Sequence, residues 1–200
     1  MIIDHCDKTI SIKIVYFGPA FSGKTTTIKA LFSHLGREEA LHSIDSTVNR
    51  TLFFDYGTVT FQNEEWKLKL HIYTTTGQDF YFVTRPVTLR AVDGIIFVLD
   101  SQEEVHERNL ASWQELISYF RESLEEIPII VAFNKQDLPD KLNYRNFLEE
   151  IKFNRYKLSD IRFTIALSGE GVLDCFEDIL RLILGKYYKH KLVSTVNWFS

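Results

Sequence analysis

A glycine-rich segment near the start of the chain has the residue types and the spacing that hold phosphate groups. Residues Gly18–Thr25 read GPAFSGKT and match the pattern G-x-x-x-x-G-K-[ST]. Gly18 and Gly23 allow backbone angles at which successive N–H groups point toward phosphate oxygens. Lys24 would place its charge on the β- and γ-phosphates, and the Thr25 hydroxyl would bind Mg²⁺. A chance turn is the alternative, but the segment lies between a strand-like and a helix-like stretch, so we predict a phosphate-binding loop.

A second polar segment has the spacing that selects a guanine base. The apolar run Pro128–Phe133 ends in the sequence NKQD at positions 134–137. The Asp137 carboxylate can accept two hydrogen bonds from the N1–H and exocyclic amine of guanine, and adenine offers neither donor there. The Lys135 stem would lie along the purine face, and Asn134 would brace the surrounding loops. By itself this segment could equally be a solvated turn closed by Pro139, but together with a phosphate-binding loop it predicts a guanine nucleotide site.

The elements that must position these motifs alternate between strand and helix. Short apolar runs are separated by segments whose apolar residues recur at helical spacing, which indicates βαβ units and a mostly parallel sheet covered by helices. We predict a doubly wound α/β fold of the P-loop NTPase type, with a mostly parallel sheet of six strands, one of them an antiparallel edge strand, and about five helices. The predicted strands are Thr9–Phe17, Thr51–Phe61, Trp66–Tyr73, Gly94–Asp100, Pro128–Phe133 and Ile161–Leu167; the predicted helices are Lys24–Leu35, one ending near Leu124, Asn143–Ile151 and one from Val172 to Tyr187.

Composition excludes several functional classes. The 200 residues are 45% hydrophobic and 14% aromatic, which is enough for one packed domain and too much for a disordered chain. A net charge of −4 argues against nucleic acid as the main ligand. Cys6 and Cys175 form no metal-ligand or disulfide pattern, and the six histidines show no metal spacing. No signal peptide, integral membrane segment or lipidation motif is seen, so we expect a cytoplasmic protein that reaches membranes only through partners.

Four segments carry a resemblance to a known family. They are KIVYFGPAFSGKTT at 13–26, RTLFFDYG at 50–57, HIYTTTGQDFY at 71–81 and RAVDGIIFVLDS at 90–101. With the NKQD segment, they make the chain similar to the Ras-like small GTPase superfamily over about residues 9–188, and within it to the MglA-type GTPases of bacterial gliding motility. The resemblance implies one GTPase domain at 1–188 followed by a tail at 189–200.

The resemblance also implies individual roles. Thr51 matches a threonine that binds Mg²⁺ in the triphosphate state, and Gln78, after Gly77, matches a glutamine that orients the attacking water. Arg50 matches an arginine that MglA-type proteins supply from their own chain. The predicted catalytic residues are Lys24, Arg50 and Gln78, and the predicted metal ligands are Thr25 and Thr51. Ala166 matches the backbone donor to the guanine carbonyl. The full set of predicted nucleotide contacts is Gly18, Ala20, Ser22, Gly23, Lys24, Thr25, Thr26, Thr51, Gly77, Asn134, Lys135, Asp137, Ala166 and Leu167.

These roles have physical grounds and plain alternatives. A glutamine amide can donate to phosphate and accept from water, and an arginine stabilises the charge that spreads over a transferring phosphoryl group. Gln78 could instead be an ordinary turn residue, and Arg50 a solvated cation at the edge of a strand.

The chain departs from the common Ras-like pattern at three positions. Thr74 stands where most members have an aspartate of the D-x-x-G motif, although MglA-type proteins share this threonine. Ala20 stands where glycine is favoured, and its methyl group could crowd the glutamine and arginine and slow turnover. Leu167 replaces a polar residue beside the base.

Together these observations predict a GTP-operated switch that uses GTP/GDP and Mg²⁺ and hydrolyses GTP slowly. By resemblance, a roadblock-type (MglB-like) activator would accelerate it, effectors would bind its switch segments, and its output would be cell polarity or surface motility. The alternative is a scaffold that holds GTP without hydrolysing it. Lys186, Lys189 and Lys191 form either a solvated helix end or a contact with an anionic surface.

Overall fold

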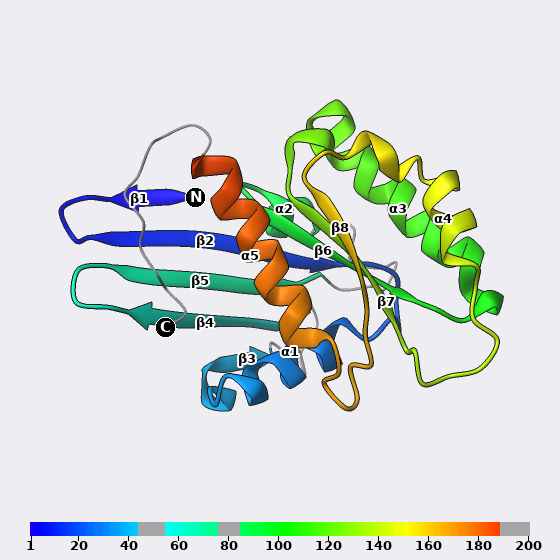
Figure 1. Ribbon diagram of the computed structural model, residues 1–200, viewed down its shortest axis with the longest axis horizontal. Helices are drawn as coiled ribbons and strands as arrows, with labels where there is room; N and C mark the ends of the chain where they lie inside the picture. Colours follow the sequence, from blue (N-terminus) through cyan, green and yellow to red (C-terminus); the bar gives the residue numbers. More distant parts are fainter. Residues whose placement is uncertain (44–54, 76–84, 189–200) are drawn as a thin grey trace, which may run out of the picture.

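The computed structural model describes residues 1–43, 55–75 and 85–188, and within them a single mixed sheet organises the chain (Figure 1). The strands run in the order β3-β4-β5-β2-β6-β7-β8, and β1 pairs with β2 alongside this path. Their bounds are β1 Ile2–Asp4, β2 Thr9–Phe17, β3 Leu41–Ser43, β4 Asp55–Gln62, β5 Lys67–Thr74, β6 Gly94–Asp100, β7 Ile129–Asn134 and β8 Ser159–Phe163.

The strand directions confirm the predicted fold class. Strands β5, β2, β6, β7 and β8 are mutually parallel, whereas β4 is antiparallel to β5. The six long strands correspond to the six predicted ones. Two additional strands, β1 and β3, have only three residues each, which is too short to show a period in the sequence. Because β3 pairs with β4 in antiparallel fashion, β4 is not the edge of the sheet.

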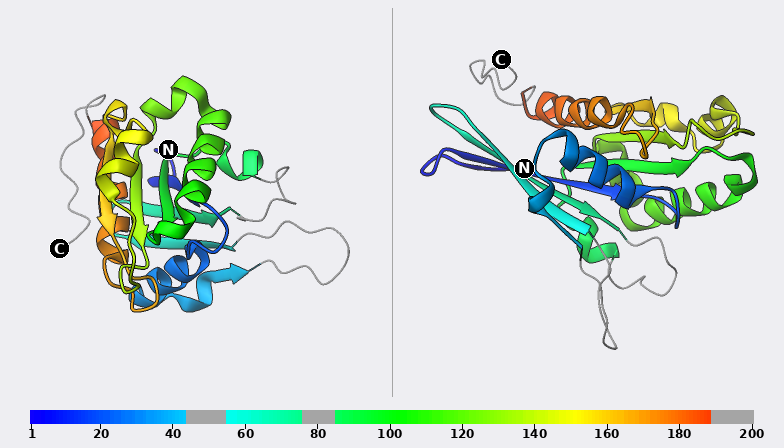
Figure 2. Two further views of the ribbon diagram at one scale, coloured as in Figure 1. Left: turned by 90° about the vertical axis from the view of Figure 1, so that its right-hand side faces the viewer. Right: turned by 90° about the horizontal axis from the view of Figure 1, so that it is seen from below.

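Helices cover the two faces of the sheet and create two cores. The α-helices are α1 Lys24–His34, α2 Arg85–Leu89, α3 His106–Phe120, α4 Tyr144–Glu150 and α5 Val172–Tyr188, with short 3₁₀ segments at Glu38–Ala40, Glu103–Val105, Arg121–Glu126 and Phe153–Arg155. One core lies under α1 and α5, and the other lies under α2, α3 and α4. Figure 2 shows α5 and α3 on opposite sides of the strands.

Two element ends and one short helix differ from the sequence-based expectations. The last strand ends at Phe163 and not at Leu167, because the chain turns back there and Ile165 N–H bonds to Glu170 O. The helix predicted to reach Leu124 stops at Phe120, because Arg121 has a positive φ of 53°. The five-residue α2 was not predicted, since so short a segment shows no helical repeat.

The topology gathers the ends of four parallel strands at one edge of the sheet. Strand β2 leads into the glycine-rich loop, and β6, β7 and β8 end at Asp100, Asn134 and Phe163. Ligands of open α/β sheets bind at such an edge. Among the described residues, no helix is long and apolar enough to cross a membrane, and Cys6 and Cys175 are both free.

Candidate functional site

The glycine-rich loop folds tightly because its two glycines leave no room for a side chain. Gly18 has φ +147°, and a Cβ atom there would lie 2.1 Å from Val98 O. Gly23, which precedes α1, has φ +100°, and a Cβ atom there would lie 2.3 Å from Asn134 Nδ2. Both positions therefore require glycine, as the sequence motif predicted.

Lys24 lies folded inside this loop. Its side chain is 6% exposed, and its Nζ donates hydrogen bonds to Gly18 O at 2.9 Å and Pro19 O at 2.6 Å. The pKa of Lys24 is lowered to about 7, chiefly by burial and secondly by the nearby charges of Arg85 and Arg108, while Asp55 and Glu115 act in the opposite sense. A bound anion would favour the charged ammonium form of this side chain.

The other loop positions differ in their surroundings. Ser22 is fully buried, and its Oγ has no hydrogen-bond partner among the described residues. Ala20 and Thr26 are half-buried. Phe21 has φ +63° and is 77% exposed, so the loop holds an aromatic side chain out into solvent.

A carboxylate that the sequence reasoning missed lies beside the predicted metal ligand. Thr25 Oγ1 donates to Asp55 Oδ2 at 2.5 Å, and Thr74 Oγ1 lies 3.3 Å from the same oxygen. In addition, Asp55 N–H donates to Thr74 Oγ1 at 2.8 Å. Asp55 therefore places a buried carboxylate beside the threonine that replaces the usual D-x-x-G aspartate. Asp55 and Thr74 meet one position beyond the Tyr56–Tyr73 pair of the β4–β5 ladder, so this contact is visible only in the structure.

Asn134, the last residue of β7, joins two loops through one amide group. Its Nδ2 donates to Ser22 O at 2.8 Å, and its Oδ1 accepts from Ala166 N at 2.9 Å and from Thr164 Oγ1 at 3.2 Å. Asn134 is 1% exposed, so these partners lie in a dry environment. The amide thus links the glycine-rich loop to the loop after β8, as the sequence-based interpretation of a bracing residue predicted.

The remaining members of the NKQD segment point outward to different degrees. Lys135 Nζ forms an ion pair with Asp100 Oδ2 at 2.6 Å, and Asp100 is itself 2% exposed. This partner was also missed, although its position at the end of a buried strand was a signal. Asp137 is exposed at the rim of the loop. The carboxylate that would accept hydrogen bonds from a base is therefore accessible.

The loop after β8 differs in one detail from the expectation. The Ala166 N–H, predicted to donate to a guanine carbonyl, donates to Asn134 Oδ1 in this structure. The Leu167 side chain is 83% exposed. The next backbone N–H, that of Leu167, has no hydrogen-bond partner within the described part of the chain. This N–H is therefore available to donate to a ligand.

Four predicted residues lie outside the described residues: Arg50, Thr51, Gly77 and Gln78. The crowding predicted for Ala20 concerns two of them and stays a prediction. The described chain resumes after the second of these segments at Arg85, at the start of α2. Arg85 is buried and forms an ion pair with Glu115 of α3, whose other oxygen accepts from Tyr119 OH at 2.7 Å.

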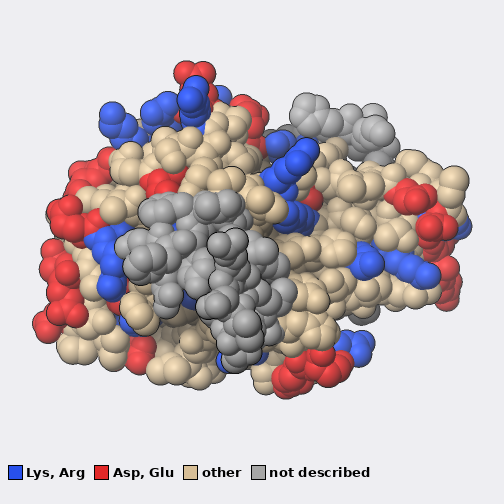
Figure 3. All heavy atoms as spheres, turned by 180° about the vertical axis from the view of Figure 1, so that it is seen from behind, with Lys and Arg blue, Asp and Glu red and all other residues tan. Residues whose placement is uncertain are grey.

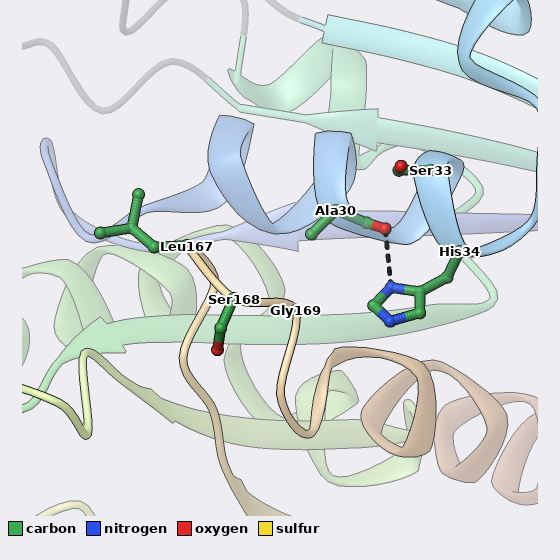
Figure 4. A pocket seen from close by; sticks show the side chains of 6 residues that line it. All are labelled: Ala30, Ser33, His34, Leu167, Ser168 and Gly169. Carbon is green, nitrogen blue, oxygen red and sulfur yellow. Dashed lines mark hydrogen bonds between the residues drawn. The ribbon is translucent and has the colours of Figure 1, made fainter.

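A separate pocket adjoins the loop after β8 (Figure 4). It has a volume of about 320 Å³ and lies between α1 and the segment 167–169. His34 Nδ1 donates to Ala30 O at 2.9 Å on its α1 side. The pocket contains no residue of the glycine-rich loop and none of the NKQD segment. Among the described residues, no group of three or more His, Cys, Asp or Glu side chains could hold a metal ion by itself.

The fold and these loops define a P-loop nucleotide-binding domain, and comparison with known proteins gives its family. Residues 13–137 match the family described as Ras of Complex, Roc, domain of DAPkinase. Mutual gliding-motility protein MglA of Myxococcus xanthus (strain DK1622) is 32% identical over 193 residues, which cover 94% of this chain and 97% of that protein.

Two eukaryotic relatives support the same assignment. ADP-ribosylation factor-like protein 6 of Caenorhabditis elegans is 27% identical over 164 residues, 80% of each chain. Ras-related protein Rab-5B of Plasmodium falciparum (isolate 3D7) is 28% identical over 180 residues, 88% of this chain and 79% of that protein. The chain therefore belongs to the Ras-like small GTPases, enzymes that bind and hydrolyse GTP, and the predicted resemblance to MglA-type proteins is confirmed.

Proposed function

We propose that this protein is a GTP-operated switch in cell polarity or surface motility, whose slow hydrolysis a dedicated activator accelerates. The observation that carries the nucleotide site is the bracing by Asn134, because one buried amide brings the phosphate-binding and base-binding loops to a common point. A binding site for phosphates and base together needs such a fixed separation between its two ends.

The phosphate end of the proposed site rests on the folded glycine-rich loop. Lys24 would exchange its two carbonyl partners for β- and γ-phosphate oxygens, and the N-terminus of α1 would face the anion. The Thr25 hydroxyl and the Asp55 carboxylate fit a magnesium ion, which favours oxygen donors and retains several waters. When bound, Mg²⁺ would neutralise charge on the phosphates. We propose that Asp55 takes the place of the absent D-x-x-G aspartate.

The base end of the proposed site selects guanine through the accessible Asp137 carboxylate. Lys135 is held by Asp100, so its stem is positioned before any base is present. Backbone N–H groups of the loop at Ala166 and Leu167 would meet the guanine carbonyl, with Leu167 taking the larger share because Ala166 is already bonded to Asn134.

Hydrolysis and signalling would depend on the two segments outside the described residues. We propose that Thr51 binds Mg²⁺ only in the triphosphate state, that Gln78 after Gly77 orients the attacking water, and that Arg50 stabilises the transition state. Loss of the γ-phosphate would release these segments, so partners would distinguish the two states.

The cellular role is proposed from the relatives. The name of the M. xanthus protein connects it with gliding motility. We propose a related role here, in the cytoplasm, with a roadblock-type (MglB-like) activator, and with membrane association only through partners.

Base selectivity gives the first test. Asp137→Asn should lower the affinity for GTP and raise that for xanthosine triphosphate, whose C2 carbonyl would meet the new amide donor. The expected loss for GTP is about 2–4 kcal/mol, because hydrogen bonds to a charged acceptor are strong. Competition binding with GTP, ATP and xanthosine triphosphate measures it, with Asp140→Asn in the same loop as the control. Equal binding of ATP and GTP by the wild type would refute the guanine assignment.

Single-turnover phosphate release tests the hydrolytic roles. Gln78→Leu and Arg50→Ala should slow hydrolysis while leaving GTP affinity within a few-fold, because both groups act mainly in the transition state. For Arg50→Ala we expect a loss of about ten- to a thousand-fold with activator present. Identical rates for the wild type and Gln78→Leu, with no activator raising either, would favour the scaffold over the switch.

A further inference from the structure

One residue of the glycine-rich loop combines a strained backbone with an exposed aromatic ring. Phe21 has φ +63°, in the left-handed region that residues other than glycine rarely adopt. It occupies the third position of a β-turn that Ser22 N–H closes on Pro19 O at 3.4 Å. A positive φ at that position of a turn favours glycine. The Phe21 ring is 77% exposed, so contacts within the described chain do not offset this strain.

Phe21 belongs to a small set of exposed apolar side chains. Among the residues that the structure describes, five large apolar side chains are exposed: Ile2, Phe21, Val87, Phe163 and Leu167. On the face shown in Figure 3, charged side chains of both signs are spread among uncharged ones, so neither sign dominates it. Three of the five apolar side chains, Phe21, Phe163 and Leu167, lie where β2 and β8 lead into the loops of the proposed nucleotide site.

Phe21 and Leu167 flank the point at which their two loops are joined. The Asn134 amide donates to the carbonyl of Ser22, the residue after Phe21. The same amide accepts from the N–H of Ala166, the residue before Leu167. The two exposed apolar side chains are therefore each one residue away from a partner of the same buried amide.

The two loops are also in direct contact at this point. A Cβ atom at Gly23 would lie 4.0 Å from the Cβ of Ala166. Figure 4 shows Leu167 at the end of its loop that lies toward the start of α1, away from His34 and Gly169. The exposed ring of one loop and the exposed aliphatic group of the other thus stand on two sides of a single junction.

The place of Phe21 in the proposed site indicates which part of the nucleotide its ring can reach. The phosphate end of the site is formed around Lys24, and the base end is formed around Asp137. Phe21 lies in the phosphate-binding loop, but next to the residue that Asn134 connects to the base-binding loop. The part of a nucleotide between its phosphates and its base is the ribose.

We propose that Phe21 covers the ribose of the bound guanine nucleotide and slows its release; the proposal rests on the proposed function and names a further residue of the same site. The C–H groups of a ribose are apolar, so burying them against an aromatic ring is favourable. Leu167 would cover the nucleoside from the side of the base. Strain at ligand-binding positions persists where it serves the ligand, and the bound sugar would give the ring at Phe21 that use.

The connection of sugar to phosphate favours the nucleotide over a partner protein as the group that covers Phe21. A ribose is bonded directly to its α-phosphate, so any nucleotide whose phosphates fill the loop carries a sugar within reach of that loop. A phenyl ring has no hydrogen-bonding group and no charge, so it adds nothing to the recognition of the phosphates themselves. Its use in this loop is therefore to bury apolar surface.

The release rate of GDP tests the proposal. The full chain is loaded with tritiated GDP and Mg²⁺, because this label leaves the ribose unmodified. Phe21→Ala and Phe21→Gly should release GDP about ten-fold faster than the wild type, since apolar burial is lost. Phe21→Tyr keeps a ring and should release GDP at the wild-type rate. The control Ile2→Ala truncates an apolar side chain that is 72% exposed on β1, and should change nothing.

A ligand without a sugar separates contact with the ribose from damage to the loop. Pyrophosphate occupies only the phosphate end, so Phe21→Gly should bind it as tightly as the wild type or more tightly, because glycine adopts a positive φ without strain. The same variant should lose GDP affinity. Nuclear Overhauser spectra of bound GDP should show contacts between ribose protons and a phenylalanine ring, and these contacts should be absent in Phe21→Leu.

The outcomes separate this proposal from the proposed function. Equal losses of GDP and pyrophosphate affinity would mean that Phe21 only shapes the loop, and would overturn the proposal. Unchanged GDP release in Phe21→Ala would overturn it too, and a lost response to an activator protein in that variant would assign the ring to a partner. A wild type that binds GDP and is matched by its variants contradicts only the role of Phe21, whereas one that binds neither GDP nor GTP contradicts the switch itself.

Discussion

The two halves of the sheet are built in different ways. Strands β6 and β7 are buried along their whole length, with helices on both faces. Asn109 Nδ2 of α3 donates to Asp100 O at the end of β6, and Asn134 Nδ2 at the end of β7 donates to Ser22 O of the glycine-rich loop. Strands β4 and β5 alternate between more and less buried side chains, and within the described ranges helices α1 and α5 cover one of their faces. The first half holds the proposed base-binding loops, and the second half leads into the proposed switch segments.

The difference indicates a division of labour. Groups that recognise the base must keep one geometry whether or not a nucleotide is present, and a doubly covered, braced region provides it. Groups that respond to the γ-phosphate must change position, and elements that move are drawn from less constrained regions. The predictions below test the braced half first and then the junction between the two halves.

Removing the bracing amide should have the largest effect. Asn134→Ala deletes three hydrogen bonds and leaves buried partners on two loops unpaired, at a cost of at least about 3 kcal/mol in unfolding free energy. GTP affinity should fall by about a hundred-fold or more, because the loops lose their common point. Denaturant unfolding and calorimetric titration measure the two effects. Asn146→Ala, at an exposed position of α4, is the control, and an equal effect there would refute the bracing role.

Removing the Asp55 carboxylate, which lies where the two halves of the sheet meet, should have a smaller effect that depends on magnesium. Asp55→Ala should weaken GTP binding about ten- to a hundred-fold in the presence of Mg²⁺ and little in its absence. Adding Thr74→Asp to this variant restores a carboxylate on the neighbouring strand and should recover part of the loss. Titrations with and without a chelator measure the difference. A loss of the same size without Mg²⁺ would mean that Asp55 acts only through its contacts with Thr25 and Thr74.

The smallest effect concerns the protonation of Lys24. Because burial lowers the pKa of this side chain to about 7 in the empty site, it is charged below that pH and increasingly neutral above it. Bound phosphates would raise the pKa, so GTP binding above pH 7 should take up a proton, and affinity should fall toward about ten-fold per pH unit. Calorimetry at pH 8 in two buffers of different ionisation enthalpy measures the uptake. Lys24→Arg stays charged and should not show it; identical uptake in that variant would exclude Lys24 as the source.

Much of the braced half could be predicted from the sequence. The runs GIIFVLD and PIIVAF are continuously apolar because both of their faces are buried, so their strands were evident. The role of Asn134 as a brace followed from its place at the end of a buried strand. The end of β8 was misplaced because Thr164 and Ala166 form hydrogen bonds with Asn134, 30 and 32 residues earlier in the chain.

Sequence by itself determined the family, the fold class, the phosphate-type loop and the guanine-type motif, because each depends on residues close together in the chain or on a repeating apolar pattern. Only the tertiary structure decided that Asp55 stands beside Thr25 and Thr74, that the Ala166 N–H is already engaged, and that Phe21 and Leu167 flank one junction of two loops. The physical reason is that these contacts depend on strand register and loop packing, which join segments distant in sequence and leave no local pattern.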